Sequence, residues 1–120
     1  MYRIAFYRTP RDECPFQIFL EGHNEKVRTK FGKLVTALEE YGPNLKRPYA
    51  DILRDDIREL RVGFGGNSYR ALYFFFIRDL IVITHAFTKK TDSVPPAEIE
   101  RALRYKKDFE TRLALGEYEL

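Results

Sequence analysis

The sequence lacks most of the residues and motifs that mark metal-dependent or cofactor-dependent enzymes. It has a single cysteine, Cys14, so no internal disulfide can form, which fits a reducing compartment. Its only two histidines, His23 and His85, exclude a metal site rich in histidine. It contains no P-loop, GxGxxG or GxSxG motif. We therefore predict neither a metal nor an organic cofactor.

Long apolar runs are also missing. No stretch reaches the length that spans a membrane, and the opening residues MYRIAFYRTPRD are too polar for a signal peptide. We therefore expect a cytoplasmic protein without a membrane partner. With 120 residues, of which 44% are hydrophobic and 15% aromatic, the chain can form one folded domain over residues 1–120.

One segment, Ile57 to Lys90, predicts three consecutive strands joined by tight turns. Tyr69–Ile77 and Leu80–Phe87 are mostly β-branched, aromatic or aliphatic, and the two residues between them favour a hairpin. The sequence Gly65-Gly66-Asn67-Ser68 predicts the preceding turn, because glycine and asparagine accept positive φ. Arg58–Val62 alternates polar with apolar residues, as a strand with one exposed face does.

The rest of the chain predicts a leading strand and three helices. Tyr2–Tyr7 alternates as a strand does, and Phe16–Glu21 follows a proline that suits the first turn of a helix. Glu25–Tyr41 carries one apolar stripe at helical spacing, with Asn24 as its cap. Pro95-Pro96 opens the last helix.

These elements predict an α+β domain. We expect an antiparallel sheet of about four strands, with an N-terminal helical hairpin and a C-terminal helix packed on one face. Ala50–Leu53 is expected to form a turn over the sheet edge. Because buried charges are costly, Glu59, Arg61, Arg70 and His85 should share an exposed basic face or one end of the sheet.

The formal net charge of +3 arises in the predicted sheet. Arg54–Lys90 contains seven of the 21 basic residues and four of the 18 acidic ones, so this segment carries the whole excess. A basic sheet on an otherwise balanced protein indicates a polyanionic partner. The alternative is a solvated sheet face without a ligand.

Several side chains of this segment suit RNA cleavage by attack of a 2′-hydroxyl on the adjacent phosphate. Arginine grips phosphate through two N–H groups and lysine supplies a point charge, so both stabilise the charge of a phosphorane. The cations that qualify are Arg61, Arg70, Lys89 and Lys90. Proton transfer also needs a positioned acid and base. The candidates for it are a lysine of lowered pKa, Glu59, Tyr69, Tyr73 and His85.

Each candidate also has a purely structural interpretation. In it, Glu59 forms a cross-strand ion pair with Arg61 or Arg70. His85 is a packed or hydrogen-bonded sheet histidine. The tandem lysines, which follow Phe87, are a solvated strand end.

A set of short motifs in this chain resembles a known family. The motifs are Glu59-Leu60-Arg61, Tyr69-Arg70, His85-Ala86-Phe87-Thr88-Lys89-Lys90-Thr91, a proline, and Glu98-Ile99-Glu100-Arg101-Ala102. Together they resemble the phage-derived HigB-like branch of the RelE/ParE toxins. The resemblance covers nearly the whole chain, including the leading strand and the helical hairpin, and implies a RelE-like small domain.

The resemblance implies the toxin of a type II toxin–antitoxin pair. Such toxins enter the ribosomal A site and cut mRNA without a metal. Their usual partner is a small helix-turn-helix antitoxin, here a HigA-like one, which also binds operator DNA and so permits a larger toxin–antitoxin complex there. Two alternatives stay open: a ParE-like inhibitor of DNA gyrase with the same fold, and a phage-derived binding protein without activity.

The resemblance also assigns roles to individual residues. It implies that Arg61 and Arg70 hold the scissile phosphate, that Lys89 and Lys90 bind substrate or transfer a proton, and that Phe87 packs or stacks on a base. With the candidates above, we predict Arg61, Arg70 and Lys89 as catalytic residues and Lys90, Phe87, Glu59 and His85 as substrate-binding residues. Strand alternation puts Lys89 on the same face as Phe87 and Lys90 on the opposite one, which favours Lys89 for chemistry. The chain lacks the late histidines of the original HigB toxins, so the resemblance assigns no general base.

Overall fold

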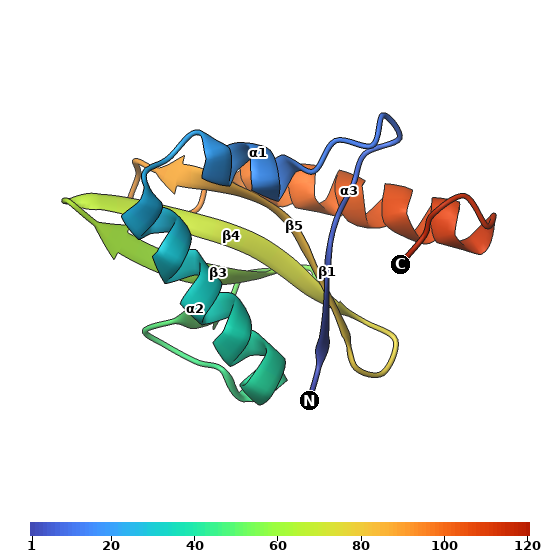
Figure 1. The fold of residues 1–120 in the computed structure, drawn as a ribbon, viewed down its shortest axis with the longest axis horizontal. Coiled ribbons are helices and arrows are strands. Elements are labelled where there is room, and N and C mark those ends of the chain that lie inside the picture. Colours follow the sequence, from blue (N-terminus) through green and yellow to red (C-terminus); the bar gives the residue numbers. More distant parts are fainter.

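The computed structural model describes residues 1–120 and contains a five-stranded sheet between two layers of helix (Figure 1). The elements in chain order are β1 (Arg3–Phe6), α1 (Pro15–Glu21), α2 (Glu25–Tyr41), the 3-10 helix η1 (Gly42–Asn44), β2 (Ala50–Ile52), β3 (Arg58–Phe64), β4 (Asn67–Phe76), β5 (Leu80–Lys89) and α3 (Pro96–Ala114). The predicted leading strand, three consecutive strands and C-terminal helix are therefore confirmed. The two predicted N-terminal helices are present, but α1 packs mainly against β5 and α2 against β3, so they do not form the predicted hairpin.

The sheet is mixed, with the strand order β1-β5-β4-β3-β2. β1 runs parallel to β5, with Arg3 opposite Leu80, and the other neighbours are antiparallel. The prediction of an antiparallel sheet of about four strands is wrong in the strand count and in the direction of β1. The fifth strand is β2, in which Ala50 pairs with Leu60 where the sequence predicted a turn. A three-residue strand is too short to show a period of two.

Helices cover both faces of the sheet, whereas the sequence predicted one covered face and one free face. α1 and α2 pack on the face that contains Leu60, Val62, Tyr73 and Ile83. α3 packs on the opposite face, which contains Leu72, Phe74, Val82 and Phe87. The central strands are apolar on both faces, and strands of this kind read as continuous apolar runs because each face is covered.

A β-bulge sets which side chains of β5 face α3. The register places Leu72 opposite His85 but Tyr73 opposite Ile83, so Thr84 is the extra residue. An extra residue shifts the alternation beyond it by one position. As a result His85 and Phe87 face α3, on the same side as Val82.

The ends of α2 follow the predicted capping. The Asn24 side chain accepts a hydrogen bond of 3.0 Å from the backbone N–H of Val27. Gly42 stops the helix with a φ of 51°, which favours glycine. A Cβ atom there would lie 2.2 Å from the ring of Tyr2, so this glycine also allows α2 to end against the residue that precedes β1.

Candidate active site

The sheet register brings the predicted site residues to one face and one end of the sheet. Arg61 on β3 lies opposite Arg70 on β4, and Arg70 lies opposite Phe87 on β5. Residues two apart on a strand share a face, so Glu59 joins Arg61, and Lys89 joins Phe87. Three strands therefore contribute to a single group of side chains on the face that α3 covers. The predicted shared face for Phe87 and Lys89 is confirmed by the pairing of Lys89 with Ser68 in the regular β4–β5 ladder.

Glu59 forms ion pairs with both strand arginines. Its Oε1 lies 2.8 Å from Nε of Arg70, and its Oε2 lies 3.6 Å from Nε of Arg61. Arg70 also donates from Nη1 to the Ser68 hydroxyl at 2.6 Å and to the Tyr69 carbonyl at 3.1 Å. The Arg70 guanidinium is thus held in a fixed orientation, while Arg61 is attracted to the same carboxylate at a longer distance.

The members of this cluster differ in their exposure. Glu59 and Arg70 are buried, at 4% and 5% exposure, while the Arg61 side chain is 33% exposed. The expectation that these side chains share an exposed face is therefore wrong for Glu59, Arg70 and His85. Glu59 and Arg70 are tolerated inside because each offsets the charge of the other. Arg61 is the cation of the cluster that a ligand can reach.

Burial changes the acidity of the buried pair. It raises the pKa of the Glu59 carboxyl, and the nearby Arg70 and Arg61 guanidiniums offset part of that effect. It also lowers the pKa of Arg70, an effect that Glu59 opposes. Glu59 therefore orients two arginines at the cost of its own desolvation, which makes it a positioning residue for Arg61.

His85 is buried, at 1% exposure, and is hydrogen-bonded on both ring nitrogens. Nε2 lies 3.1 Å from Oε1 of Glu98 in α3, and Nδ1 lies 3.0 Å from the Thr84 hydroxyl. Burial, followed by the charges of Arg101 and Arg104, lowers the pKa of His85 to about 3. The ring is neutral at pH 7 and ties β5 to the first turn of α3, as a hydrogen-bonded sheet histidine does.

The residues at the end of β5 differ in their surroundings. Phe87 is buried at 8% exposure in the core under α3, with its ring centroid 5.9 Å from that of His85, so it packs in the core. Lys89, the last residue of β5, is half-buried, and Lys90 lies beyond the strand and is exposed. Neither lysine forms an ion pair. Lys89 is therefore the strand cation with a free ammonium group.

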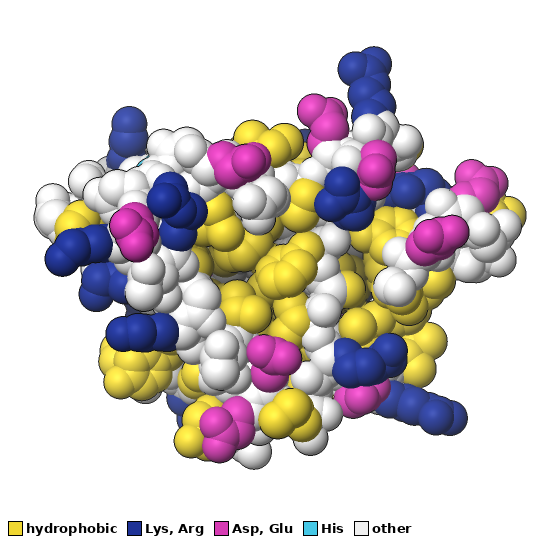
Figure 2. Space-filling view, viewed as in Figure 1, with side chains coloured by type: hydrophobic (Ala, Val, Ile, Leu, Met, Phe, Trp, Pro, Cys, Tyr) yellow, Lys and Arg dark blue, Asp and Glu magenta, His cyan; other side chains and the backbone are white.

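Arg61 also opens onto a hollow that the sequence reasoning missed. The hollow has a volume of about 280 Å³ and joins the end of β3 to Lys30 and Lys33 of α2 and to Tyr49. Tyr49 is held beside Arg61 by a backbone hydrogen bond of 2.8 Å from the Arg61 N–H to the Tyr49 carbonyl. Figure 2 shows the face that α1 and α2 cover, with Lys and Arg side chains gathered near the turn between these two helices. In the sequence, these two lysines lie off the apolar stripe of α2, and this position indicated that their side chains are free to line a surface hollow.

Two further observations concern metal ligands and membrane-spanning helices. No group of three or more His, Cys, Asp or Glu side chains lies close enough together to hold a metal ion. No helix combines the length and the apolar character that crossing a membrane requires.

Comparison with known families gives one match. The family model described as phage derived protein Gp49-like (DUF891) matches residues 19–107. This range holds every predicted site residue, and it leaves out β1 and the last turns of α3. A comparison with curated proteins finds no match to the chain.

Proposed function

We propose that this chain, which belongs to the Gp49-like family of phage-derived proteins within the RelE/HigB-like toxin superfamily, is a toxin that cuts mRNA in the ribosomal A site. The observation that carries the proposal is the partly exposed Arg61 guanidinium, paired with Glu59 and backed by Arg70. A charged pair buried within an apolar sheet is costly, and orienting a catalytic cation is a use that accounts for it.

In the proposed reaction Arg61 and Lys89 act together on one phosphate. Their strands, β3 and β5, flank β4, and Lys89 lies two residues beyond the position opposite Arg61, so their Cα atoms are separated by roughly 12 Å, which two long side chains can bridge from either side. Arg61 holds the scissile phosphate, and Arg70 adds positive charge from beneath it. These charges stabilise the phosphorane as negative charge develops.

The chemical step forms one bond and breaks one. The 2′-hydroxyl oxygen attacks the adjacent phosphorus and loses its proton, and the bond from phosphorus to the 5′-oxygen breaks. The products are a 2′,3′-cyclic phosphate and a 5′-hydroxyl that has gained a proton. We assign proton transfer to Lys89, because Tyr73, His85 and Glu59 are all buried.

The partners follow from the same proposal. The substrate is mRNA on the ribosome in the cytoplasm, and the hollow between Arg61 and the α2 lysines offers a path for the RNA backbone. The inhibitor is a helix-turn-helix antitoxin of the HigA type. A reading frame for such a protein beside this one would support this part.

The test is cleavage of mRNA on programmed ribosomes by purified protein. We expect cleavage by the wild type and by Arg11→Ala, a control in an exposed loop. We expect loss of at least 100-fold with Arg61→Ala, since one charge-stabilising group is worth roughly 10² or more. Intact mRNA together with arrested growth and inhibited gyrase would instead establish the ParE-like activity.

A further inference from the structure

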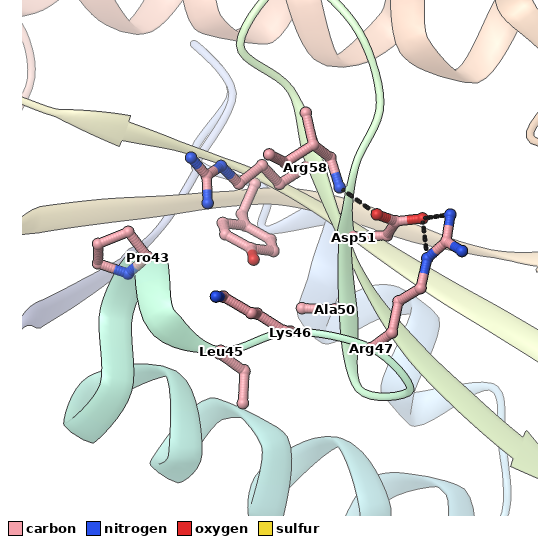
Figure 3. Close-up of a pocket in the computed structure, with 9 residues that line it drawn as sticks. Pro43, Leu45, Lys46, Arg47, Ala50, Asp51 and Arg58 are labelled. Atoms are coloured by element: carbon pink, nitrogen blue, oxygen red, sulfur yellow. Dashed lines mark hydrogen bonds and ion pairs between the residues drawn. The ribbon is translucent and has the colours of Figure 1, made fainter.

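A second pocket lies on the other side of the sheet from the Arg61 cluster. It has a volume of about 370 Å³, within the range of small-molecule sites, and opens between η1, β2 and the start of β3 (Figure 3). Arg58 and Tyr73 are direct partners across β3 and β4, and both alternate with residues of the Arg61 cluster. The pocket therefore lies on the face that α1 and α2 cover, whereas Glu59, Arg61 and Arg70 lie on the face that α3 covers.

The pocket carries two cations without acidic partners. Neither Lys46 nor Arg58 forms an ion pair, and the Arg58 guanidinium lies 4.8 Å from the centroid of the Phe75 ring. The one carboxylate of the lining, Asp51, is already engaged, with Oδ2 2.7 Å from Arg47 and Oδ1 accepting from the backbone N–H of Ile52. The charge left unpaired in the pocket is positive.

Tyr73 supplies an unpartnered donor to the same pocket. Its side chain lines the pocket and is fully buried, and its hydroxyl has no hydrogen-bond partner. Burial raises the pKa of Tyr73 to about 12, so the hydroxyl stays protonated at physiological pH. Buried polar groups in native proteins are nearly always paired, and a ligand oxygen would provide the missing acceptor.

We propose that this pocket binds a small phosphomonoester. Lys46 and Arg58 neutralise the two charges of its phosphate, and the Tyr73 hydroxyl donates to one phosphate oxygen. The remainder of the ligand lies against the apolar part of the lining, which consists of Pro43, Leu45, Ala50 and Ile52. A phosphate fits better than a carboxylate because it offers three oxygens and about two charges to three donors. The site is separate from RNA cleavage and does not depend on it.

The test uses inorganic phosphate and adenosine 5′-monophosphate as probes, with adenosine as the control that lacks the charge. Binding is measured by calorimetry and by the shift of the unfolding midpoint, because a ligand of the native state raises it. We expect both phosphates to bind the wild type and adenosine not to bind. Stronger binding of the monophosphate would show that the apolar wall contributes, and equal binding would restrict the site to the phosphate group itself.

Tyr73→Phe is the decisive variant. Because the hydroxyl is unpaired without ligand, its removal should leave the unfolding midpoint of the free protein unchanged or raised. The same change should weaken phosphate binding about tenfold, since it removes a hydrogen bond to a charged group. Arg58→Ala should weaken binding by at least as much, and Lys107→Ala on exposed α3 should have no effect.

Arg61→Ala tests whether phosphate binds in this pocket or beside Arg61. Phosphate binding that survives Arg61→Ala and weakens in Tyr73→Phe supports the proposal. Three results would overturn it: no binding of either phosphate at millimolar concentration, equal binding by wild type and Tyr73→Phe, or binding that disappears in Arg61→Ala.

Discussion

The buried imidazole of His85 makes the stability of the fold depend on pH in a defined window. In the native state burial lowers the pKa of His85 to about 3, against an ordinary value of 6.5. Below pH 6.5 the unfolded chain therefore binds a proton at this position, while the native chain does not. Stability contributed by the neutral ring is complete above pH 6.5 and is lost as the pH falls from 6.5 towards 3.

The size of the effect follows from these two values. Between pH 7.5 and pH 5.0, protonation of the unfolded chain at one histidine lowers the free energy of unfolding by about 2 kcal/mol. A matched variant is His85→Gln, which cannot titrate but keeps an N–H donor for Glu98. Its free energy of unfolding should therefore change by about 2 kcal/mol less than that of the wild type over the same pH range.

The assay is urea unfolding of wild type and His85→Gln at several pH values between 7.5 and 5.0. The quantity compared is the slope of the free energy of unfolding against pH. The constant free-energy cost of the substitution does not change a slope, and groups that titrate in both proteins contribute equally to both slopes. Parallel curves would refute the reasoning, because they would mean that the pKa of His85 is the same in the native and unfolded chains. A wild type that gains stability relative to His85→Gln as the pH falls would refute it too, because the native ring would then be an imidazolium paired with Glu98.

Three further predictions concern the proposed active site. Arg70→Ala should lower the free energy of unfolding by about 3 kcal/mol, because it leaves the buried Glu59 carboxylate with only its 3.6 Å contact to the partly exposed Arg61, and Glu59→Leu/Arg70→Leu should recover most of the loss in urea unfolding; a double variant as unstable as Arg70→Ala would show that the pair is not the cause. Lys89→Arg keeps the charge but cannot release a proton, so it should bind ribosomes normally and cut mRNA slowly, whereas Lys90→Arg should do both like the wild type; full single-turnover cleavage by Lys89→Arg would reduce Lys89 to an electrostatic contact. Cleavage should persist in EDTA and leave a 2′,3′-cyclic phosphate or a 3′-phosphate, and a 3′-hydroxyl at the cut end would exclude attack by the 2′-hydroxyl.

The elements that sequence could predict are those whose pattern is local. α2 extends over Glu25–Tyr41 as the apolar stripe and the asparagine cap predicted, because a helix of 17 residues displays its period several times. β1 was predicted as a strand, but its parallel pairing with β5 was not, since no local pattern records which strand is the neighbour. The continuous apolar runs of β4 and β5 indicate that helices cover both faces of the sheet, although only one covered face was predicted.

The candidate site, too, was only partly predictable from the sequence. Alternation along the last strand placed Lys89 and Phe87 on one face before any pairing was known. The burial of Glu59 could not be foreseen, because it depends on which arginine lies beside it across the sheet and on the position of α3. The pocket at Tyr73 is likewise a product of tertiary structure, since η1 and β2 close over it only in the fold.

The parallel pairing of β1 with β5 has a consequence for the order in which the chain is made. The ribosome synthesises Arg3 long before Leu80, its partner, so the first strand must wait for almost the whole sheet. β3, β4 and β5 are consecutive and need only short loops to pair, whereas β1 closes a loop that contains both α1 and α2. Arg61 and Lys89 lie on β3 and β5, the two strands that flank β4. A nascent chain therefore cannot assemble the proposed site until β5 has left the ribosome.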